Sequence, residues 1–383
     1  MANLLPGSVR ARPPRKRSQA HGGIAPLSPY TGSQAFQPLP APLGQPPYRY
    51  NLNQAIPQID QTVAKAGKLV FHVVGDTGGI KNPEYQRQVA ATMKQDLNTK
   101  GADRPSFFYH LGDVIYYNGE LSKYYDQFYE PYDHYDAPIF SIPGNHDGDP
   151  INASQTSLDG WCAYFMTQTP HIDPRSQDAP RVTMSLPNVY FTLECPFVTI
   201  VGMYTNVPEH GSIDSVQQQW LTNEVFEAPK DKALIVCLHH PIYSFDDHHG
   251  GSPRMADAVQ HAINDSRRVP NLVLTAHVHN YQRIEKKVAG LGPTPFIVAG
   301  SGGYYHLHGL SAKNGDSDAA TGARLIASDD KRHGYLTLTV TADTISGTMT
   351  AMTKGSGNPV TGVDKFQYPT ALLTLPKNAT VSL

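Results

Sequence analysis

Residues 69–76 read LVFHVVGD, an apolar run that ends in a glycine and an aspartate. Two later stretches repeat this arrangement, with FFYHLGD at residues 107–113 and PIFSIPGN at residues 138–145. Short apolar runs rich in β-branched and aromatic side chains predict buried strands, and the glycine marks the point where each one ends. We therefore expect three strands that each place a carboxylate or an amide at the strand end.

The rest of the chain alternates between predicted strands and predicted helices. Asn82 and Pro83 supply an N-cap and a first-turn proline for a helix that continues to about residue 98. Further strands are predicted at residues 190–194, 197–204, 233–240, 272–277 and 295–300, with a helix at 213–227 and a hairpin at 334–352. This alternation is typical of an α/β fold, in which the carboxyl ends of adjacent strands face one edge of the sheet.

The first part of the chain has a different composition. Residues 1–50 contain ten prolines, few periodic apolar positions and a basic cluster at residues 10–17. Such a segment cannot bury enough apolar surface to fold, so we predict a flexible tail over residues 1–60 and one folded domain over residues 61–383. The basic cluster could contact nucleic acid, but a solvated tail is the more common role of such a cluster.

Charge and hydropathy exclude several classes of protein. The 383 residues include 31 Lys and Arg against 33 Asp and Glu, so the net charge of −2 provides no broad attraction to nucleic acid or anionic lipid. No apolar stretch approaches the roughly 20 residues that span a bilayer, and no secretory signal is recognisable at the start. We expect a cytoplasmic protein without membrane or nucleic-acid partners. Its three cysteines cannot all pair, and Cys237 is expected to be a buried thiol.

Five short polar blocks follow the predicted strands. They are GDTG at residues 75–78, GDVIY at 112–116, GNHD at 144–147, HHP at 239–241 and HVH at 277–279. Each block alone has an ordinary explanation as a loop, a helix cap or a packed histidine. Their joint order indicates a site for two metal ions, because ions about 3.5 to 4 Å apart need a bridging carboxylate with oxygen and imidazole ligands on both flanks.

These blocks resemble those of the calcineurin-like metallophosphoesterase superfamily, and within it the purple acid phosphatase branch, over roughly residues 68–305. Most members of the superfamily carry Asp-x-His in the first block, and here the histidine position is Gly78. Tyr116 instead lies three residues after Asp113, which is the purple acid phosphatase replacement for the missing ligand. The resemblance implies a four-layer α/β/β/α sandwich of two mixed sheets flanked by helices, of the short type with a single catalytic domain.

The resemblance also implies a ligand for each metal. The implied set is Asp76, Tyr116 and His279 for the first metal, Asp113 as the bridge, and Asn145, His239 and His277 for the second. A phenolate is a hard anionic donor, so the resemblance implies Fe(III) at the Tyr116 site, and the mixed second site accepts Fe(II), Zn or Mn. The HVH block follows Ala276 where the family usually has glycine, and a methyl group must fit there.

Three histidines are candidate catalytic residues. His146, which the resemblance places near the substrate, can hydrogen-bond the phosphate or protonate the leaving oxygen. His248 and His249 fall where relatives place phosphate-contacting histidines, although a polar loop is the alternative. His306 and His308 could line the rim or simply be solvated.

The expected activity is that of an acid phosphatase acting on a small phosphorylated substrate. We expect the second metal to bind an oxygen of the phosphate monoester while a hydroxide on the first metal attacks phosphorus in line. A phosphodiesterase or nucleotide hydrolase of the same superfamily is an alternative, but members of that kind usually retain Asp-x-His, which Gly78 contradicts. A non-catalytic scaffold is a further alternative, although scaffolds tend to lose ligands and all seven positions are filled here. Oligomeric state is left open by the sequence.

Overall fold

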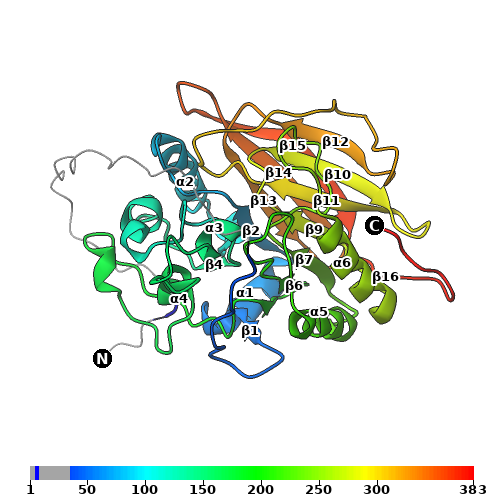
Figure 1. Ribbon diagram of the computed structural model, residues 1–383, viewed down its shortest axis with the longest axis horizontal. Coiled ribbons are helices and arrows are strands. Elements are labelled where there is room, and N and C mark those ends of the chain that lie inside the picture. Colours follow the sequence, from blue (N-terminus) through cyan, green and yellow to red (C-terminus); the bar gives the residue numbers. More distant parts are fainter. Residues whose placement is uncertain (1–4, 8–34) are drawn as a thin grey trace.

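A computed structural model describes residues 5–7 and 35–383 (Figure 1). The first three predicted strands lie in a six-stranded mixed sheet, where β2, β3 and β4 run parallel. The predicted C-terminal hairpin joins this sheet through β13, which pairs antiparallel with β2, and β14 pairs antiparallel with β13. In sheet order its strands are β15 (Pro359–Pro369), β14 (Thr344–Met352), β13 (Gly334–Val340), β2 (Leu69–Val74), β3 (Phe108–His110) and β4 (Ile139–Ser141).

An eight-stranded mixed sheet forms the second half of the fold, and its centre is parallel from β6 through β7 and β9 to β11. In sheet order its strands are β1 (Arg49–Asn51), β5 (Phe191–Glu194), β6 (Val198–Gly202), β7 (Ala233–Cys237), β9 (Leu272–Thr275), β11 (Pro293–Ala299), β10 (Tyr281–Lys287) and β12 (Arg324–Asp329). A separate two-stranded sheet pairs β8 (Arg268–Val269) with β16 (Leu373–Thr374).

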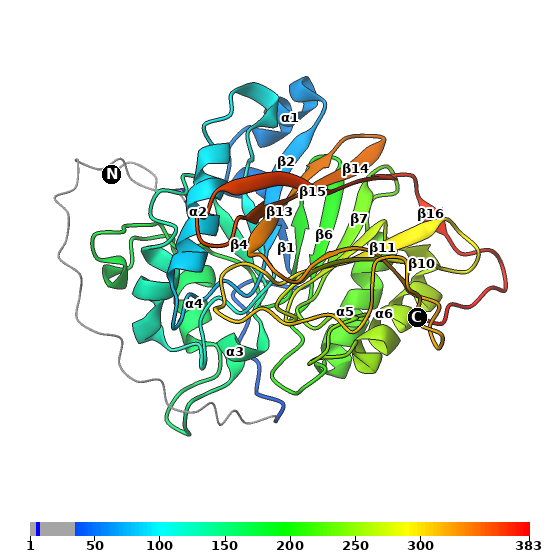
Figure 2. The same cartoon turned by 90° about the horizontal axis from the view of Figure 1, so that it is seen from above.

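Helices cover the outer faces of the two sheets, which completes the expected α/β/β/α order (Figures 1 and 2). The α-helices are α1 (Ile59–Ala66), α2 (Glu84–Asp96), α3 (Asn145–Gly148), α4 (Asp159–Phe165), α5 (Ser215–Glu227) and α6 (Pro253–Ser266). Shorter helical turns are η1 (Leu52–Gln54), η2 (Gly101–Asp103), η3 (Leu121–Lys123), η4 (Tyr125–Tyr129) and η5 (Pro174–Ser176). The α2 helix begins one residue later than predicted, with Pro83 at the cap position. None of the helices in the described part of the chain is long and apolar enough to cross a membrane.

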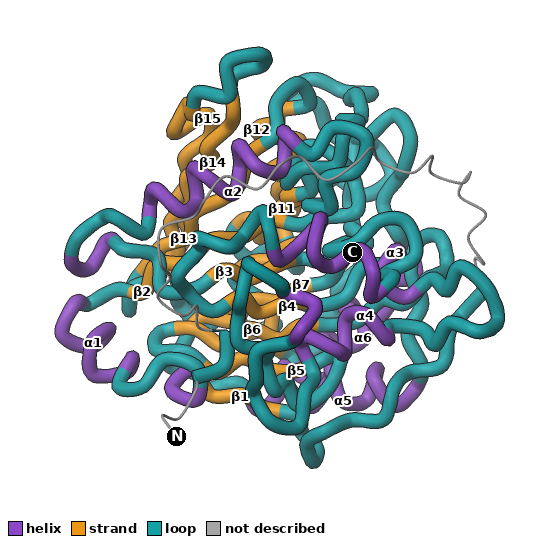
Figure 3. The backbone as a smooth tube through the Cα atoms, turned by 90° about the vertical axis from the view of Figure 1, so that its left-hand side faces the viewer, coloured by secondary structure: helices purple, strands orange, loops and turns teal. Residues whose placement is uncertain are grey.

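The core lies between the sheets, with helices and loops outside the strands (Figure 3). Cys237 on β7 is fully buried as a free thiol, as expected. At the interface the ring of Tyr109 on β3 lies 6.5 Å from that of Phe191 on β5. Gly202 on β6 faces the same tyrosine, and a methyl group at residue 202 would collide with the Tyr109 hydroxyl and with Ile142. The two sheets are therefore close enough here to require a glycine.

Folded structure is present between residues 35 and 60, within the range predicted as a tail. Residues 8–34, with the basic cluster, lie outside the described residues, but β1 pairs in parallel with β5, and Tyr50 and Leu52 are buried. Arg49 adds a bidentate ion pair with Glu224 on α5. The correction has a simple cause, because a three-residue strand surrounded by prolines is too short to show a periodic pattern.

We expect Gly202→Ala to lower the free energy of unfolding by about 1–3 kcal/mol, because the added methyl group overpacks the contact between the sheets. Chemical denaturation monitored by circular dichroism measures this. Gly292→Ala is the matched control, since a Cβ at that position meets no atom within 4 Å. Equal stability of the two variants would show that the sheets can separate locally at no cost.

Candidate metal centre

Both sheets contribute to the predicted ligand set. The loops after β2, β3 and β4 carry Asp76, Asp113 and Asn145, all of them buried. Buried histidines come from the loops after β7 and β9 of the other sheet: His239, His277 and His279. The carboxyl ends of the two parallel strand groups therefore meet at one place, where the sequence pattern predicted a site.

One group of side chains surrounds the hydroxyl of Tyr116. This hydroxyl donates to Asp76 Oδ1 at 2.9 Å and lies 3.2 Å from His279 Nε2, and His279 Nε2 is 3.6 Å from Asp76 Oδ1. The other ring nitrogen of His279 donates to the backbone oxygen of His306 at 3.2 Å, which leaves Nε2 as the atom that faces the group. Two oxygens and one imidazole nitrogen thus converge, which is the donor set implied for the first metal.

Tyr116 fills the space that a side chain at residue 78 would need. A Cβ on Gly78 would lie 2.7 Å from Tyr116 Cδ2 and 2.5 Å from Gln127 Oε1. Gln127 in turn holds Tyr116 in place, because its amide accepts from the backbone N–H of Tyr116 and donates to the backbone oxygen, both at 2.9 Å. The Tyr116 ring can therefore occupy this position only because residue 78 is a glycine.

A second group gathers around Asn145. Its Oδ1 lies 3.0 Å from His239 Nε2 and 3.0 Å from His277 Nδ1. Asp113 Oδ2 approaches His239 Nε2 at 3.4 Å, and Asp113, His239 and His277 present ligand atoms that all lie within 4.8 Å of one another. The backbone oxygen of Leu111 fixes the other nitrogen of His239 at 2.9 Å. Asp113 thus stands next to the second group, as a bridging ligand must.

The buried oxygen atoms of this centre fit a cation. Among the described residues, Asp113 Oδ2 makes no hydrogen bond, and its ion-pair contact is His239 Nε2 at 3.4 Å. A buried carboxylate oxygen without a hydrogen bond is costly, and a metal ion removes that cost. Carboxylate, phenol, amide and imidazole donors in two adjacent groups are what two ions with mixed oxygen and nitrogen ligands require.

Three of the ligand positions have an unusual backbone. Asp76, Asp113 and His277 adopt φ values of 55°, 55° and 66°, in the left-handed region that side chains other than glycine rarely occupy. Ala276 fits where the family pattern has glycine because its methyl group lies against Gly75, which has no side chain of its own. Strained backbone of this kind concentrates at functional sites.

The charges of the two aspartates are set by their surroundings. Burial opposes ionisation of Asp113, but His239 and His146 outweigh it and hold the pKa of this carboxyl well below its ordinary value. Burial, together with the charge of Asp113, raises the pKa of Asp76 well above its ordinary value. Burial lowers the pKa of His239, but the neighbouring charge of Asp113 raises it more, to about 9. In the absence of metal this histidine therefore carries a proton. A metal ion would replace that proton.

Asp147 is a structural member of the site that sequence reasoning did not single out. Its buried carboxylate accepts from the backbone N–H groups of Val114, Ile115 and Gly144 at 2.9 to 3.2 Å. It therefore ties the GDVIY loop to the GNHD loop and fixes Asp113 relative to Asn145. The GNHD block contained this residue, but only the fold reveals three donors around it.

His146 lies on the side of Tyr116. Its backbone N–H donates to Asp113 Oδ1 at 2.9 Å, and its ring centroid is 4.6 Å from that of Tyr116. Ring nitrogen Nδ1 donates to the backbone oxygen of Tyr117 at 2.8 Å, because a carbonyl can only accept. This hydrogen bond fixes the orientation of the His146 ring between Tyr116 and Tyr117.

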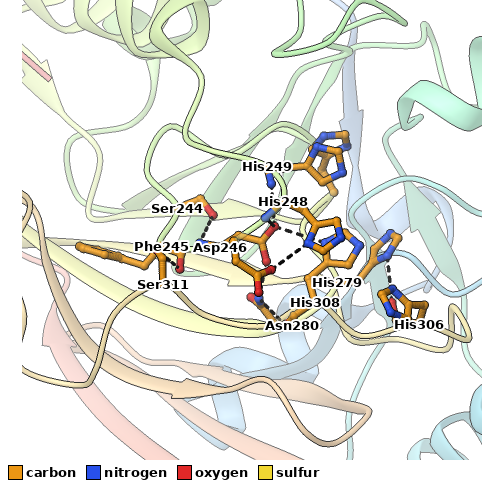
Figure 4. A network of polar contacts seen from close by, with 12 residues as sticks. Ser244, Phe245, Asp246, His248, His249, His279, Asn280, His306, His308 and Ser311 are labelled. Atoms are coloured by element: carbon orange, nitrogen blue, oxygen red, sulfur yellow. Dashed lines mark hydrogen bonds and ion pairs between the residues drawn. The ribbon is translucent and has the colours of Figure 1, made fainter.

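His248 and His249 come from one loop that Asp246 organises (Figure 4). The buried carboxylate of Asp246 accepts from the backbone N–H groups of His248 and His249 at 3.0 and 2.7 Å and from Asn280 Nδ2 at 3.0 Å. The ring of His249 lies 4.8 Å from that of His277, and its Nδ1 is 3.0 Å from Glu209 Oε1. His249 is therefore beside the second group.

His248 lies farther out, with 56% of its side chain exposed. Its ring stacks on that of His308, with the ring centroids 4.7 Å apart. The His308 ring centroid is 4.4 Å from that of His279, and His308 Nδ1 is 3.3 Å from Asp246 Oδ2. His308 is thus a buried link between the loop and the first group, whereas His306 is exposed and contributes its backbone oxygen to His279. Neither Asp246 nor Glu209 had a signal in the sequence beyond its position near a histidine.

Comparison with solved structures identifies similar folds. One is GAP50, described as the anchor in the inner membrane complex of Plasmodium, with 14% identity, a TM-score of 0.55, and coverage of 81% of this chain and 90% of that one. A purple acid phosphatase from yellow lupin (Lupinus luteus) seeds has 18% identity and a TM-score of 0.55 over 78% of this chain, which spans about half (53%) of the lupin chain. PhoD has 12% identity and a TM-score of 0.50, with coverage of 89% of this chain and 74% of the PhoD chain.

Identities this low establish likeness of fold alone. A search of curated proteins finds no match. The family comparison is decisive, because the calcineurin-like phosphoesterase model matches residues 69–281, from the first residue of β2 to the first residue of β10. That match covers more than half of the chain and every position of the ligand set, and it shows that the chain belongs to the calcineurin-like phosphoesterase family.

Proposed function

We propose that the protein is a dinuclear-metal phosphatase of the purple acid phosphatase kind that hydrolyses phosphate monoesters. The observation that carries the proposal is the Tyr116 hydroxyl, which contacts both Asp76 and His279 in space left free by Gly78. Membership of the family supports a metal-dependent phosphoester hydrolase. The tyrosine is the feature that separates this branch from members with Asp-x-His.

Seven side chains would hold the two ions. Asp76, Tyr116 and His279 would hold Fe(III), Asp113 would bridge, and Asn145, His239 and His277 would hold Fe(II), Zn or Mn. When bound, the two ions supply positive charge that polarises the phosphate and lowers the pKa of water. A phenolate ligand to Fe(III) also implies absorption of visible light.

The histidines around the metal groups have separate tasks. His146 Nδ1 is committed to a carbonyl, so Nε2 is the atom that gives a proton to the leaving oxygen. The hydrogen bond that His249 Nδ1 donates to Glu209 raises the pKa of His249 above its ordinary value, which favours a charged ring for contact with phosphate oxygens. His248, more exposed, would contact the outer part of the substrate.

A non-catalytic scaffold is the second candidate, because the fold resembles that of GAP50, which is described as an anchor. The chemistry of the site argues against it here. Asp113 is buried and its pKa is held well below the ordinary value, so a scaffold would keep the cost of a buried carboxylate without any use for it. A metal analysis together with an activity assay separates the two functions.

We expect Tyr116→Phe to abolish the visible absorption band and to lower the turnover of 4-nitrophenyl phosphate at least about 100-fold, since it removes one first-metal ligand. Absorption spectroscopy and steady-state kinetics of the metal-loaded protein measure both effects. Tyr50→Phe is the control, because this buried hydroxyl has no hydrogen-bond partner among the described residues. A wild-type protein with two metals and no activity would favour the scaffold, and a preference for diesters would favour the phosphodiesterase alternative.

Gly78→Ala tests the spatial match between Gly78 and Tyr116. The new methyl group pushes the tyrosine ring away from Asp76, so we expect a shifted or weakened absorption band and about a tenfold lower affinity for the first metal. Metal titration and the spectrum give the result, with Gly292→Ala as control. An unchanged spectrum in Gly78→Ala would contradict the assignment of Tyr116 as a ligand.

A further inference from the structure

Three tyrosines beside the first-metal group have no task in the proposed mechanism. We call Tyr117, Tyr304 and Tyr305 the tyrosine wall. The ring centroid of Tyr304 lies 4.3 Å from that of Tyr116 and 4.2 Å from that of His279. The wall therefore begins directly against two of the proposed ligands of the first metal.

The backbone of the wall is held by the site itself. The N–H of Tyr304 donates to the backbone oxygen of Asp76 at 2.9 Å, and the oxygen of Tyr304 accepts from His333 Nε2 at 2.8 Å. The backbone oxygen of Tyr117 accepts from His146, and the Tyr304 hydroxyl donates to that of Tyr117 at 3.3 Å. The wall thus has a fixed position relative to both Asp76 and His146.

The rings of the wall are arranged to receive another ring. All three rings are partly exposed. The ring centroids of Tyr117 and Tyr304 are 6.4 Å apart with an angle of 74° between the ring planes, and those of Tyr304 and Tyr305 are 4.8 Å apart with an angle of 48°. Inclined rings at these distances present both faces and edges to a third aromatic group. Stacking on such a surface depends on the π-face and not on particular hydrogen bonds.

Lys81 adds a positive charge at the far end of the wall. Its ammonium is 2.7 Å from the Tyr305 hydroxyl and 4.2 Å from the centre of that ring, and the side chain is exposed. In the described part of the chain, Lys81 forms no salt bridge with a carboxylate. The ammonium is therefore positioned, by a phenol and a ring face, to bind an anionic group.

The two sides of the metal centre differ in chemistry, which fixes how a substrate would lie. His248, His249 and His308 are on one side, next to His277 and His279, and can contact phosphate oxygens. The tyrosine wall contacts His279 through Tyr304, and its Tyr117 ring lies 5.8 Å from the ring of His146, the proposed donor to the leaving oxygen. The leaving group of the ester would thus face the wall.

We propose that Tyr117, Tyr304, Tyr305 and Lys81 form the leaving-group subsite, which selects phosphate esters of aromatic alcohols that carry an anionic group. This inference rests on the proposed phosphatase function. The ring attached to the ester oxygen stacks on the wall, and a carboxylate on its far edge meets Lys81. A nucleotide fits less well, because a sugar separates its phosphate from the base.

The subsite is tested by comparing three substrates: 4-carboxyphenyl phosphate, phenyl phosphate and glycerol 2-phosphate. Lys81→Gln should lower the kcat/KM ratio of 4-carboxyphenyl phosphate to phenyl phosphate about fivefold, as expected for one exposed ion pair. Tyr305→Leu and Tyr117→Leu should each lower the ratio of phenyl phosphate to glycerol 2-phosphate about tenfold, mainly through KM. Ratios within one variant cancel effects on folding and metal content.

Lys230→Gln, an exposed change outside the site, is the control and should leave every ratio unchanged. Unaltered ratios in all three subsite variants would overturn the inference while leaving the phosphatase intact. If the wild type hydrolyses none of the esters, the proposed function fails, and the subsite is then tested by measuring ligand binding instead of turnover. Calorimetry of the metal-loaded chain should then show tighter binding of 4-(phosphonomethyl)benzoate than of methylphosphonate, with a preference lost in Lys81→Gln; equal affinities would reject the subsite.

Discussion

The buried carboxylate of Asp76 joins the two halves of the molecule, and the site depends on it. One oxygen accepts from the Tyr116 hydroxyl, which belongs to the same sheet, and the other accepts from the backbone N–H of His277 at 2.8 Å, which belongs to the opposite sheet. The backbone oxygen of the same residue accepts from Tyr304. One residue therefore sets the positions of a ligand from each sheet and of the wall beside them. Any change in how the sheets pack would move all of these together.

This arrangement lowers the stability of the fold, and Asp76 is one of the residues at which it does so. Asp76, Asp113 and His277 each keep a left-handed backbone, and such positions cost on the order of 1 to 3 kcal/mol each. Two carboxylates are buried in addition. A fold selected for stability alone would avoid both costs, whereas bound cations offset them by neutralising the charges and by binding the side chains in this geometry. Burial of the carboxylates is therefore the cost that a bound cation would remove most directly.

The sequence was informative where structure depends on neighbours along the chain. Strands β2, β3 and β4 are continuous apolar runs, and each ends at its ligand, so both strand and ligand were predictable. Strands β10 and β15 were not predicted, because their half-exposed YQRIEKK and PVTGVDKFQYP sequences have no apolar run. The roles of Asp147, Asp246 and Tyr304 were also out of reach, since each depends on partners supplied by distant segments. The pairing of Gly78 with Tyr116 came from family resemblance, and the structure supplies its steric reason.

The surroundings of the site are asymmetric in their chemistry, and the two sheets contribute to them unequally. Loops of the eight-stranded sheet bring His308 and His249, whose rings lie beside the carboxylates of Asp246 and Glu209, and the hydrogen bond to Glu209 raises the pKa of His249. Loops of the six-stranded sheet bring Tyr116, Tyr117 and His146, and the loop after β11 of the eight-stranded sheet adds Tyr304 and Tyr305, so the tyrosine wall comes from both sheets. A phosphate ester has the same division, with charged oxygens at one end and an organic group at the other. Loops at the carboxyl ends of two sheets that pack face to face can hence match both ends of such a molecule.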